Sequence, residues 1–319
     1  CLGSIIQGDD AKERDEFLLN FKQENWALAP LDSIKNLVER YGARLDVMGS
    51  TKEPPLFAAV QANRPELVHW MLSEGHADPF LTSPISHMNA LHFASRLGYP
   101  GCVVTLLPFY TNKLEIPSGS GHTALHWTTL LLDNPTEKLQ CARLLLQAGA
   151  DANALDRNGR TPLHHALFKD MARLLVDEYR ADMEVADTKH GLTQLHFYVY
   201  MRRRLPLIRY LTEQGANTHT IDNHGYSLIQ TTITEPNWET TKSYVSYFLD
   251  NKQNAALYLD KIGQNGRTPV HDIICRTRNN ELGRLEAILS FEPTLSLPCR
   301  RSNWTALHYA GMMGQPRLV

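Results

Sequence analysis

The chain has 319 residues, of which 43% are hydrophobic and 21% charged, with 32 basic against 34 acidic side chains. The formal net charge of −2 argues against a nucleic-acid-binding protein, and no apolar run of about 18 residues predicts a membrane span or membrane insertion. Five scattered cysteines, an odd number, are too few for a disulfide framework and favour a reducing, intracellular setting, either cytoplasmic or nuclear.

The first 29 residues are predicted to form an N-terminal helical cap. Apolar side chains recur at helical spacing in the segment DAKERDEFLLNFKQENWAL, at Phe17, Leu18, Phe21 and Trp26. A cap with a charged outer face keeps an open-ended repeat array soluble. The N-terminus has no secretory signal and no initiator Met, so we expect the numbered chain to begin inside a longer one.

Residues 30–319 are predicted to consist of repeated units. A four-residue motif returns at intervals of 32 to 42 residues, centred on Leu56, Leu91, Leu125, Leu163, Leu195, Leu228, Val270 and Leu307. A second apolar block follows several of these motifs, for example LVHWML at 67–72 and LIRYL at 207–211. Each unit therefore holds two short helices, and because such a unit cannot bury both apolar faces alone, neighbours must stack into a solenoid.

Turn signals separate the units. Gly75, Gly149 and Gly215 follow the second apolar block, where a left-handed residue closes a helix. Asn158-Gly159 then predicts a tight turn before the next helix. We expect local distortion where Tyr198 and Asp272 replace the small residues that let neighbouring first helices approach. The last unit is truncated at Val319, so we expect the segment 306–319 to be frayed.

The motif TPLH at 161–164, followed by Ala166, resembles the TPLHxA signature of the ankyrin-repeat family. The resemblance covers about eight units plus a partial first one at 31–46, and it implies an all-α solenoid of helix-turn-helix units joined by β-turn hairpin loops. In this family the signature Thr caps the first helix and the signature His bridges neighbouring backbones. That role is implied for His92, His126, His164, His196, His271 and His308.

The strongest chemical pair outside the signature pattern is His271 with Cys275, four residues apart on one predicted helix. It would suit a metal ligand pair or a thiolate, but no second pair of zinc ligands lies at a suitable spacing. Phosphate-loop and HExxH motifs are absent from the sequence. We therefore predict no catalytic residue, no metal and no cofactor, with an enzyme near His271 and Cys275 as the weakest alternative.

The resemblance implies a non-catalytic protein-protein interaction module or scaffold that binds its partner through the concave face and the turn tips. The family's contact positions, together with the densest basic cluster, give Arg157, Arg160, Phe168, Lys169, Lys189, His190, Leu192, Tyr200, Met201, Arg202, Arg203 and Arg204. Their charge predicts an acidic or phosphorylated partner segment on a basic stripe, and the family pattern LxxxxxDxN marks Asn153 as an asparagine-hydroxylation acceptor. The alternative is the targeting array of a larger enzyme, ubiquitin-ligase adaptor or channel. Partner identity and oligomeric state stay open.

Overall fold

The computed structural model describes residues 30–41, 45–46, 53–130, 133–200, 205–234, 238–249, 255, 258–263, 266–276 and 282–312. The chain divides into two compact units, one that ends at Ala181 and one that begins at Asp182. The predicted cap at 1–29 lies outside the described residues. None of the helices in the described ranges has the length and apolar character that crossing a bilayer requires.

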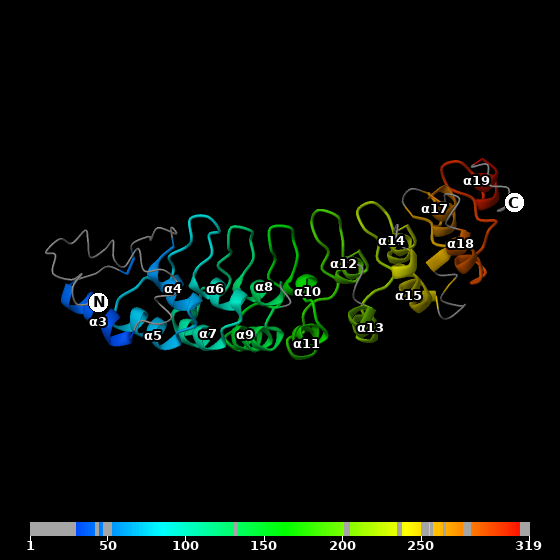
Figure 1. Cartoon of the computed structure of the whole chain (residues 1–319). Helices are drawn as coiled ribbons and strands as arrows, with labels where there is room; N and C mark the ends of the chain where they lie inside the picture. Colours follow the sequence, from blue (N-terminus) through cyan, green and yellow to red (C-terminus); the bar gives the residue numbers. More distant parts are fainter. Residues whose placement is uncertain are drawn as a thin grey trace. The chain divides into compact units, whose positions relative to one another are not determined.

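The first unit is built from pairs of short helices (Figure 1). After α3 (Leu31–Tyr41), the first helices of the pairs are α4 (Pro55–Gln61), α6 (Ala90–Leu97), α8 (Ala124–Thr129) and α10 (Pro162–His165). The second helices are α5 (Pro65–Ser73), α7 (Pro100–Leu106) with the 3-10 turn η2 (Leu107–Tyr110), α9 (Pro135–Gln147), and α11 (Lys169–Arg173) with the π-helical turn η3 (Leu174–Glu178). Each first helix packs against the first helix of the next pair, so the apolar core runs along the stack.

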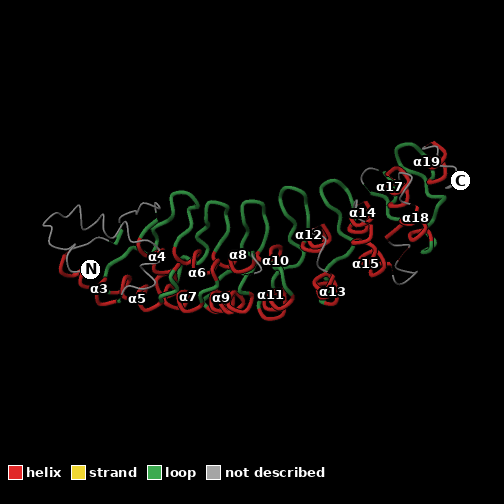
Figure 2. Tube along the Cα trace, in the orientation of Figure 1, coloured by secondary structure: helices red, strands yellow, loops and turns green. Residues whose placement is uncertain are grey.

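The second unit repeats the same arrangement. Its first helices are α12 (Gln194–Tyr200), α14 (Leu228–Thr234), α17 (Pro269–Arg276) and α19 (Ala306–Met312), and its second helices are α13 (Leu205–Glu213), α15 (Trp238–Leu249) and α18 (Leu282–Leu289). Figure 2 shows only helix and loop in the described part of the chain, and the one β-pairing there is an isolated bridge between Ile221 and Ser227. The predicted all-α ankyrin-repeat solenoid is confirmed.

The signature Thr and His hold the start of several first helices. In α8, the backbone N–H of Thr123 donates to Nδ1 of His126 over 3.2 Å, and the Thr123 side chain accepts from the His126 backbone N–H. Because Nδ1 is an acceptor, Nε2 carries the proton and donates to the carbonyl of Arg160 in the next pair, over 3.0 Å. Burial lowers the pKa of His126 to about 3, so the ring stays neutral. The structural role predicted for this histidine is confirmed.

One motif is shifted by a residue from its predicted position. In the motif centred on Leu228, YSLI, Tyr226 has the place of the signature Thr, but Ser227 caps α14, and its N–H donates to Oε1 of Gln230 over 3.0 Å. The amide Nε2 of Gln230 then reaches the carbonyl of Arg267 at 3.4 Å, as a signature His does. Ile229 therefore occupies the position that the sequence analysis gave to Leu228, and that assignment is wrong.

Helix ends follow the glycine prediction at two of three positions. Gly149 and Gly215 have φ values of 98° and 92°, which a residue with a Cβ rarely adopts. After α5, however, His76 has the positive φ, 57°, and Gly75 does not. The predicted left-handed glycine at Gly75 is wrong because the chain reverses one residue later.

The distortion predicted at Tyr198 and Asp272 is also wrong, since α12 and α17 are regular α-helices through these residues. Tyr198 is 1% exposed. The carboxylate of Asp272 accepts from Nε2 of Gln230 over 3.1 Å, which offsets the desolvation of its charge. Irregular backbone occurs instead after α10, where Ala166 is extended and the helix has four residues.

The last described helix pair has an apolar groove on its surface. The groove holds about 380 Å³ and is lined by Ile274, Leu285, Leu289, Leu295, Leu307 and Ala310, among others. Leu307 in α19 is 57% exposed and Met312 is 56% exposed. This apolar surface lies between the helix pair α17 and α18 and the helix α19.

Candidate partner-binding surface

The hairpin tips between helix pairs are held rigid by a recurring aspartate. In the tip 156–160, Oδ1 of Asp156 accepts from the backbone N–H groups of Asn158 and Arg160 over 2.7 and 2.9 Å. The tip 222–226 repeats the arrangement around Asp222, with distances of 2.9 and 2.8 Å. Because each aspartate fixes two backbone groups, the exposed tip residues are presented in a defined conformation.

The tip 187–192 is one residue longer than the tips 156–160 and 222–226. Its closing hydrogen bond runs from Asp187 N to Leu192 O over 3.0 Å, whereas the tip 156–160 closes from Asp156 N to Arg160 O over 2.9 Å. Leu192 therefore occupies the position of Arg160 and is only 7% exposed. Its assignment as a solvent-facing contact residue is wrong, because the position before the signature Thr, half-buried at Arg160, is buried at Leu192.

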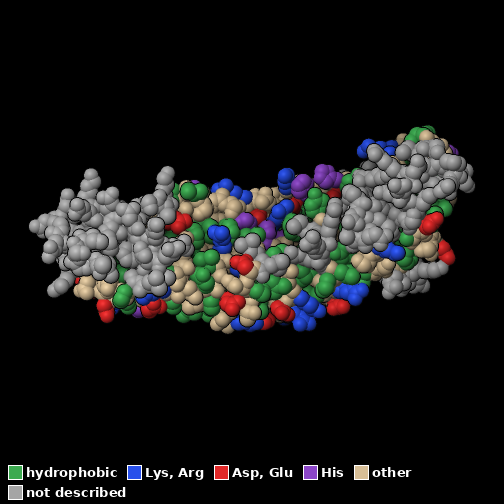
Figure 3. Space-filling view, in the orientation of Figure 1, with side chains coloured by type: hydrophobic (Ala, Val, Ile, Leu, Met, Phe, Trp, Pro, Cys, Tyr) green, Lys and Arg blue, Asp and Glu red, His purple; other side chains and the backbone are tan. Residues whose placement is uncertain are grey.

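Neighbouring tips within one unit are stacked closely. The N–H of Asn223 donates to the carbonyl of His190 over 2.8 Å, and the two imidazole rings of His190 and His224 lie 5.8 Å apart. In the first unit, a Cβ at Gly121 would lie 2.5 Å from the backbone nitrogen of Arg157. The tips of each unit thus form a continuous edge, along which Figure 3 shows histidine and basic side chains.

The structure separates the predicted contact residues by exposure. Arg157, Lys189 and Tyr200 are exposed, whereas Arg160, Phe168, Lys169 and His190 are half-buried. The first helix α10 ends at His165, so neither Phe168 nor Lys169 lies on a first helix. Phe168 is the N-cap of the second helix α11, and Lys169 is its first residue. Met201, Arg202, Arg203 and Arg204 lie outside the described residues.

The proposed basic stripe stays a prediction. Arg157 and Arg160 belong to the first compact unit and Lys189 belongs to the second. The hydroxylation of Asn153 also stays a prediction: this half-buried residue follows α9, and its backbone N–H donates to Oδ1 of Asp151 over 2.8 Å.

The pair of His271 and Cys275 does not leave a free imidazole nitrogen for metal binding or acid–base catalysis. Nδ1 of His271 accepts from the backbone N–H of Thr268 over 3.2 Å, and Nε2 donates to the carbonyl of Trp304 over 3.1 Å. Burial lowers the pKa of His271. The ring thus performs the signature task, and Cys275 is half-buried on the same helix.

Sequence analysis missed the apolar side chains of the tips. Ile85 is 80% exposed, Leu155 56% and Ile221 42%, and the latter two immediately precede the turn aspartates. Large apolar side chains on rigid, exposed backbone are suited to partner pockets. The sequence could have indicated them, since each is a large apolar residue at a predicted turn, outside the apolar positions that pack the helices.

Comparison with known proteins agrees with the repeat geometry. A family model described as "Ankyrin repeats (3 copies)" matches residues 101–187 and 130–222. Human B-cell lymphoma 3 protein is 31% identical over 202 residues, which cover 62% of this chain and 43% of that protein. The mouse NF-kappa-B inhibitor delta is 28% identical over 199 residues, which cover 54% of this chain and 60% of the relative.

A solved structure shares the fold. The ankyrin repeat domain of Bcl-3, described as a unique member of the IkappaB protein family, aligns with a TM-score of 0.55 and 27% identity, over 70% of this chain and 94% of that domain. The chain spans less than half the length of the B-cell lymphoma 3 proteins that it matches. The capped helix pairs, the bridging signature histidines and these similarities together show that the chain has the ankyrin-repeat fold and that residues 101–222 match ankyrin repeats in sequence.

Proposed function

We propose that this chain is a non-catalytic protein-binding module that grips a partner segment with its hairpin tips. The observation that carries the proposal is the tip edge itself: turns held by Asp156, Asp187 and Asp222 expose or adjoin Leu155, Arg157, Lys189 and Ile221, and the tip 83–88 exposes Ile85. The helices below the tips use most of their apolar side chains for packing. The tips are therefore the part of the fold available for recognition.

The physical basis is pre-organisation. Because Asp156 already fixes the turn that carries Leu155 and Arg157, little backbone entropy is lost when a partner docks. Burying an exposed Leu or Ile side chain contributes roughly 1.5–3 kcal/mol, and the basic residues speed association with an acidic segment.

The partner class follows from the relatives. The name of the mouse relative states that it inhibits NF-kappa-B. We therefore propose an NF-kappa-B subunit, or a protein with a similar acidic or phosphorylated segment, as the partner of this chain. The described cysteines Cys102, Cys141, Cys275 and Cys299 are free thiols, which supports an intracellular setting.

The test is surface plasmon resonance between the intact chain and purified NF-kappa-B dimers at low and high salt. Leu155→Asp and Arg157→Glu should each weaken binding at least tenfold, and the second should also reduce the salt dependence of association. Lys242→Glu is the matched control, because Lys242 is exposed on the second helix α15, away from any tip.

The two parts of the proposal fail separately. If the unaltered chain shows no binding at micromolar concentration, the partner class is wrong. If it binds and both tip variants bind equally well, the binding surface is wrong.

A further inference from the structure

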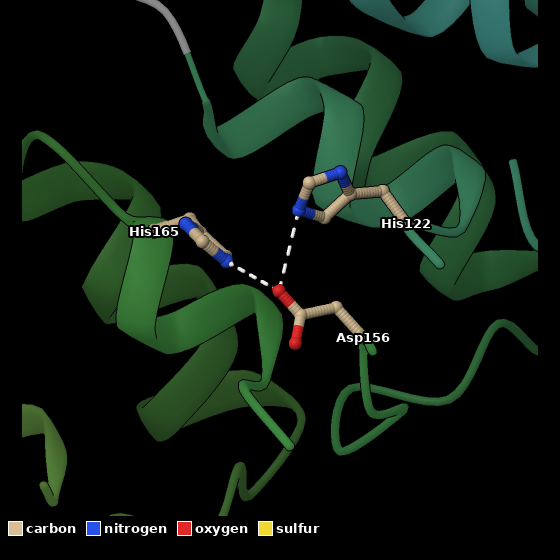
Figure 4. Close-up of side chains that lie close together, drawn as sticks. All are labelled: His122, Asp156 and His165. Carbon is tan, nitrogen blue, oxygen red and sulfur yellow. Dashed lines mark hydrogen bonds and ion pairs between the residues drawn. The ribbon is translucent and has the colours of Figure 1, made fainter. Parts of the chain in front are cut away.

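Three side chains from two successive repeats converge beside the tip 156–160 (Figure 4). His122 precedes the Thr123 cap of α8, Asp156 begins the tip, and His165 ends α10. Nε2 of His122 lies 3.3 Å from Oδ2 of Asp156, and Nε2 of His165 lies 3.2 Å from the same oxygen. All three donor atoms lie within 4.8 Å of one another. Two imidazoles thus face one carboxylate oxygen.

The carboxylate of Asp156 is divided between two tasks. Its Oδ1 accepts two backbone N–H groups of the tip, which leaves Oδ2 directed toward the histidines. The side chain is fully buried. Hydrogen bonds from the tip backbone and from both imidazoles compensate for the burial of this carboxylate. A buried anion with one available oxygen is a suitable single-oxygen metal ligand.

The imidazole of His122 is oriented by a second contact. Its Nδ1 lies 2.6 Å from Oγ of Ser120, which lies 3.1 Å from Oγ of Ser118. In the tautomer whose Nε2–H donates to Asp156, Nδ1 accepts from Ser120; in the other tautomer, Nδ1–H donates to Ser120 and the Nε2 lone pair is available to an ion that displaces the hydrogen bond to Asp156. Metal-binding histidines are commonly oriented by such an outer partner. The His122 and His165 side chains are 14% and 10% exposed, so an ion can reach them from solvent.

The adjacent His126 is not part of the donor set. Its ring lies 5.6 Å from that of His122 and 6.0 Å from that of His165, but its nitrogens are engaged by Thr123 and Arg160. Trp127 packs edge-on against His122 at 5.3 Å. These neighbours restrict the rotation of His122 and close the apolar side of the cluster.

We propose that His122, Asp156 and His165 form a divalent transition-metal site, with Zn²⁺ as the expected ion and water in the fourth position. Zinc binds imidazole nitrogen and carboxylate oxygen at about 2.0–2.2 Å, which places tetrahedral ligands about 3.3–3.5 Å apart. The two nitrogen–oxygen distances are close to that spacing, and the donor atoms lie within 4.8 Å of one another, so binding would draw the nitrogen of His165 toward that of His122. Mg²⁺ and Ca²⁺ prefer oxygen ligands and suit this set poorly.

The site would connect one repeat to the next. His122 belongs to the repeat of α8, whereas Asp156 and His165 belong to the next repeat. The first helix of that next repeat, α10, has only four residues. A bound ion would fix this short helix and the tip 156–160 to the preceding repeat. The inference does not depend on the identity of the partner protein.

The experiment is titration of the intact chain with Zn²⁺ alone, in competition with a chromophoric chelator. We expect one equivalent to bind, and His122→Gln, His165→Gln and Asp156→Asn each to weaken binding more than tenfold. Ser120→Ala should weaken it about tenfold, since outer partners typically contribute 10- to 100-fold. His224→Gln, at an exposed tip outside the cluster, is the matched control and should bind like the unaltered chain.

Cobalt substitution gives a second readout that needs no variant. Co²⁺ in the unaltered chain should show the visible spectrum of a nitrogen- and oxygen-ligated site without a thiolate charge-transfer band. Absence of stoichiometric Zn²⁺ binding at micromolar concentration, a thiolate band, or full binding by all three ligand variants would overturn the proposal. If a variant fails to fold by circular dichroism, the cobalt spectrum of the unaltered chain decides.

Discussion

Replacing His126 is the most direct perturbation of the contacts between repeats. The ring is fully buried and joins the cap of α8 to the carbonyl of Arg160 in the next helix pair. His126→Ala removes the acceptor for the backbone N–H of Thr123 and the donor for Arg160. His126→Gln restores one acceptor and one donor at similar reach, as Gln230 does in the α14 motif.

The expected loss follows from the groups left without partners. A buried backbone group that loses its partner costs about 1–3 kcal/mol. The backbone N–H of buried Thr123 cannot reach water and accounts for most of this cost, whereas the carbonyl of half-buried Arg160 can bind water. With the lost packing of the ring, His126→Ala should lower the free energy of unfolding by about 2–4 kcal/mol. His126→Gln should recover more than half of the loss.

The assay is hydrogen exchange followed by mass spectrometry, together with urea unfolding. Peptides from α8 and the tip 156–160 should exchange faster in His126→Ala, while peptides from α4 and α5 should change little, because the stack is coupled mainly through neighbours. Uniform deprotection of the whole chain, or a Gln variant as unstable as the Ala variant, would refute the bridging role.

The remaining predictions concern packing, backbone and pH. Leu163→Ala, at a fully buried position of α10, should cost about 2–5 kcal/mol in urea unfolding; a loss below about 1 kcal/mol would contradict its core position. Gly121→Ala should destabilise by more than about 1 kcal/mol, since the residue has a φ of 83° and its Cβ would meet Arg157; an unchanged melting temperature would contradict this. Burial lowers the pKa of both His92 and His196 to about 4, so the unfolded chain binds protons first as pH falls below about 6.5. The contribution of these rings to the free energy of unfolding is therefore complete above pH 6.5 and decreases toward pH 4, by up to about 3 kcal/mol for each ring. An unchanged urea midpoint between pH 7.5 and 5 would contradict this decrease.

Sequence predicted the repeats because their determinants are local. The signature Thr and His act within four residues of each other, and the apolar blocks follow helical spacing, so periodicity alone indicates paired helices. The α14 motif was misplaced because Ser227 and Gln230 perform the Thr and His tasks with different side chains. Ser227 and Gln230 can be identified as a capping box only when the first residue of the helix is known.

The surface was less predictable because it depends on register between turns. Leu192 is buried although the equivalent Arg160 is half-buried, a difference that a count of residues along the repeat does not reveal. The cluster of His122, Asp156 and His165 is assembled from off-signature positions of two repeats, 34 and 9 residues apart. The three residues do not lie on one helix, so sequence spacing does not relate them. The stacking of the two repeats brings their side chains together.

The central claim, that the tip edge binds a protein partner, is tested most directly by hydrogen exchange of the intact chain with and without a purified NF-kappa-B dimer. Tip segments 118–122, 156–160 and 222–226 should gain protection in the complex, while the second helices α9 and α13 should not. Protection confined to the second helices, with the tips exchanging as in the free chain, would contradict the claim.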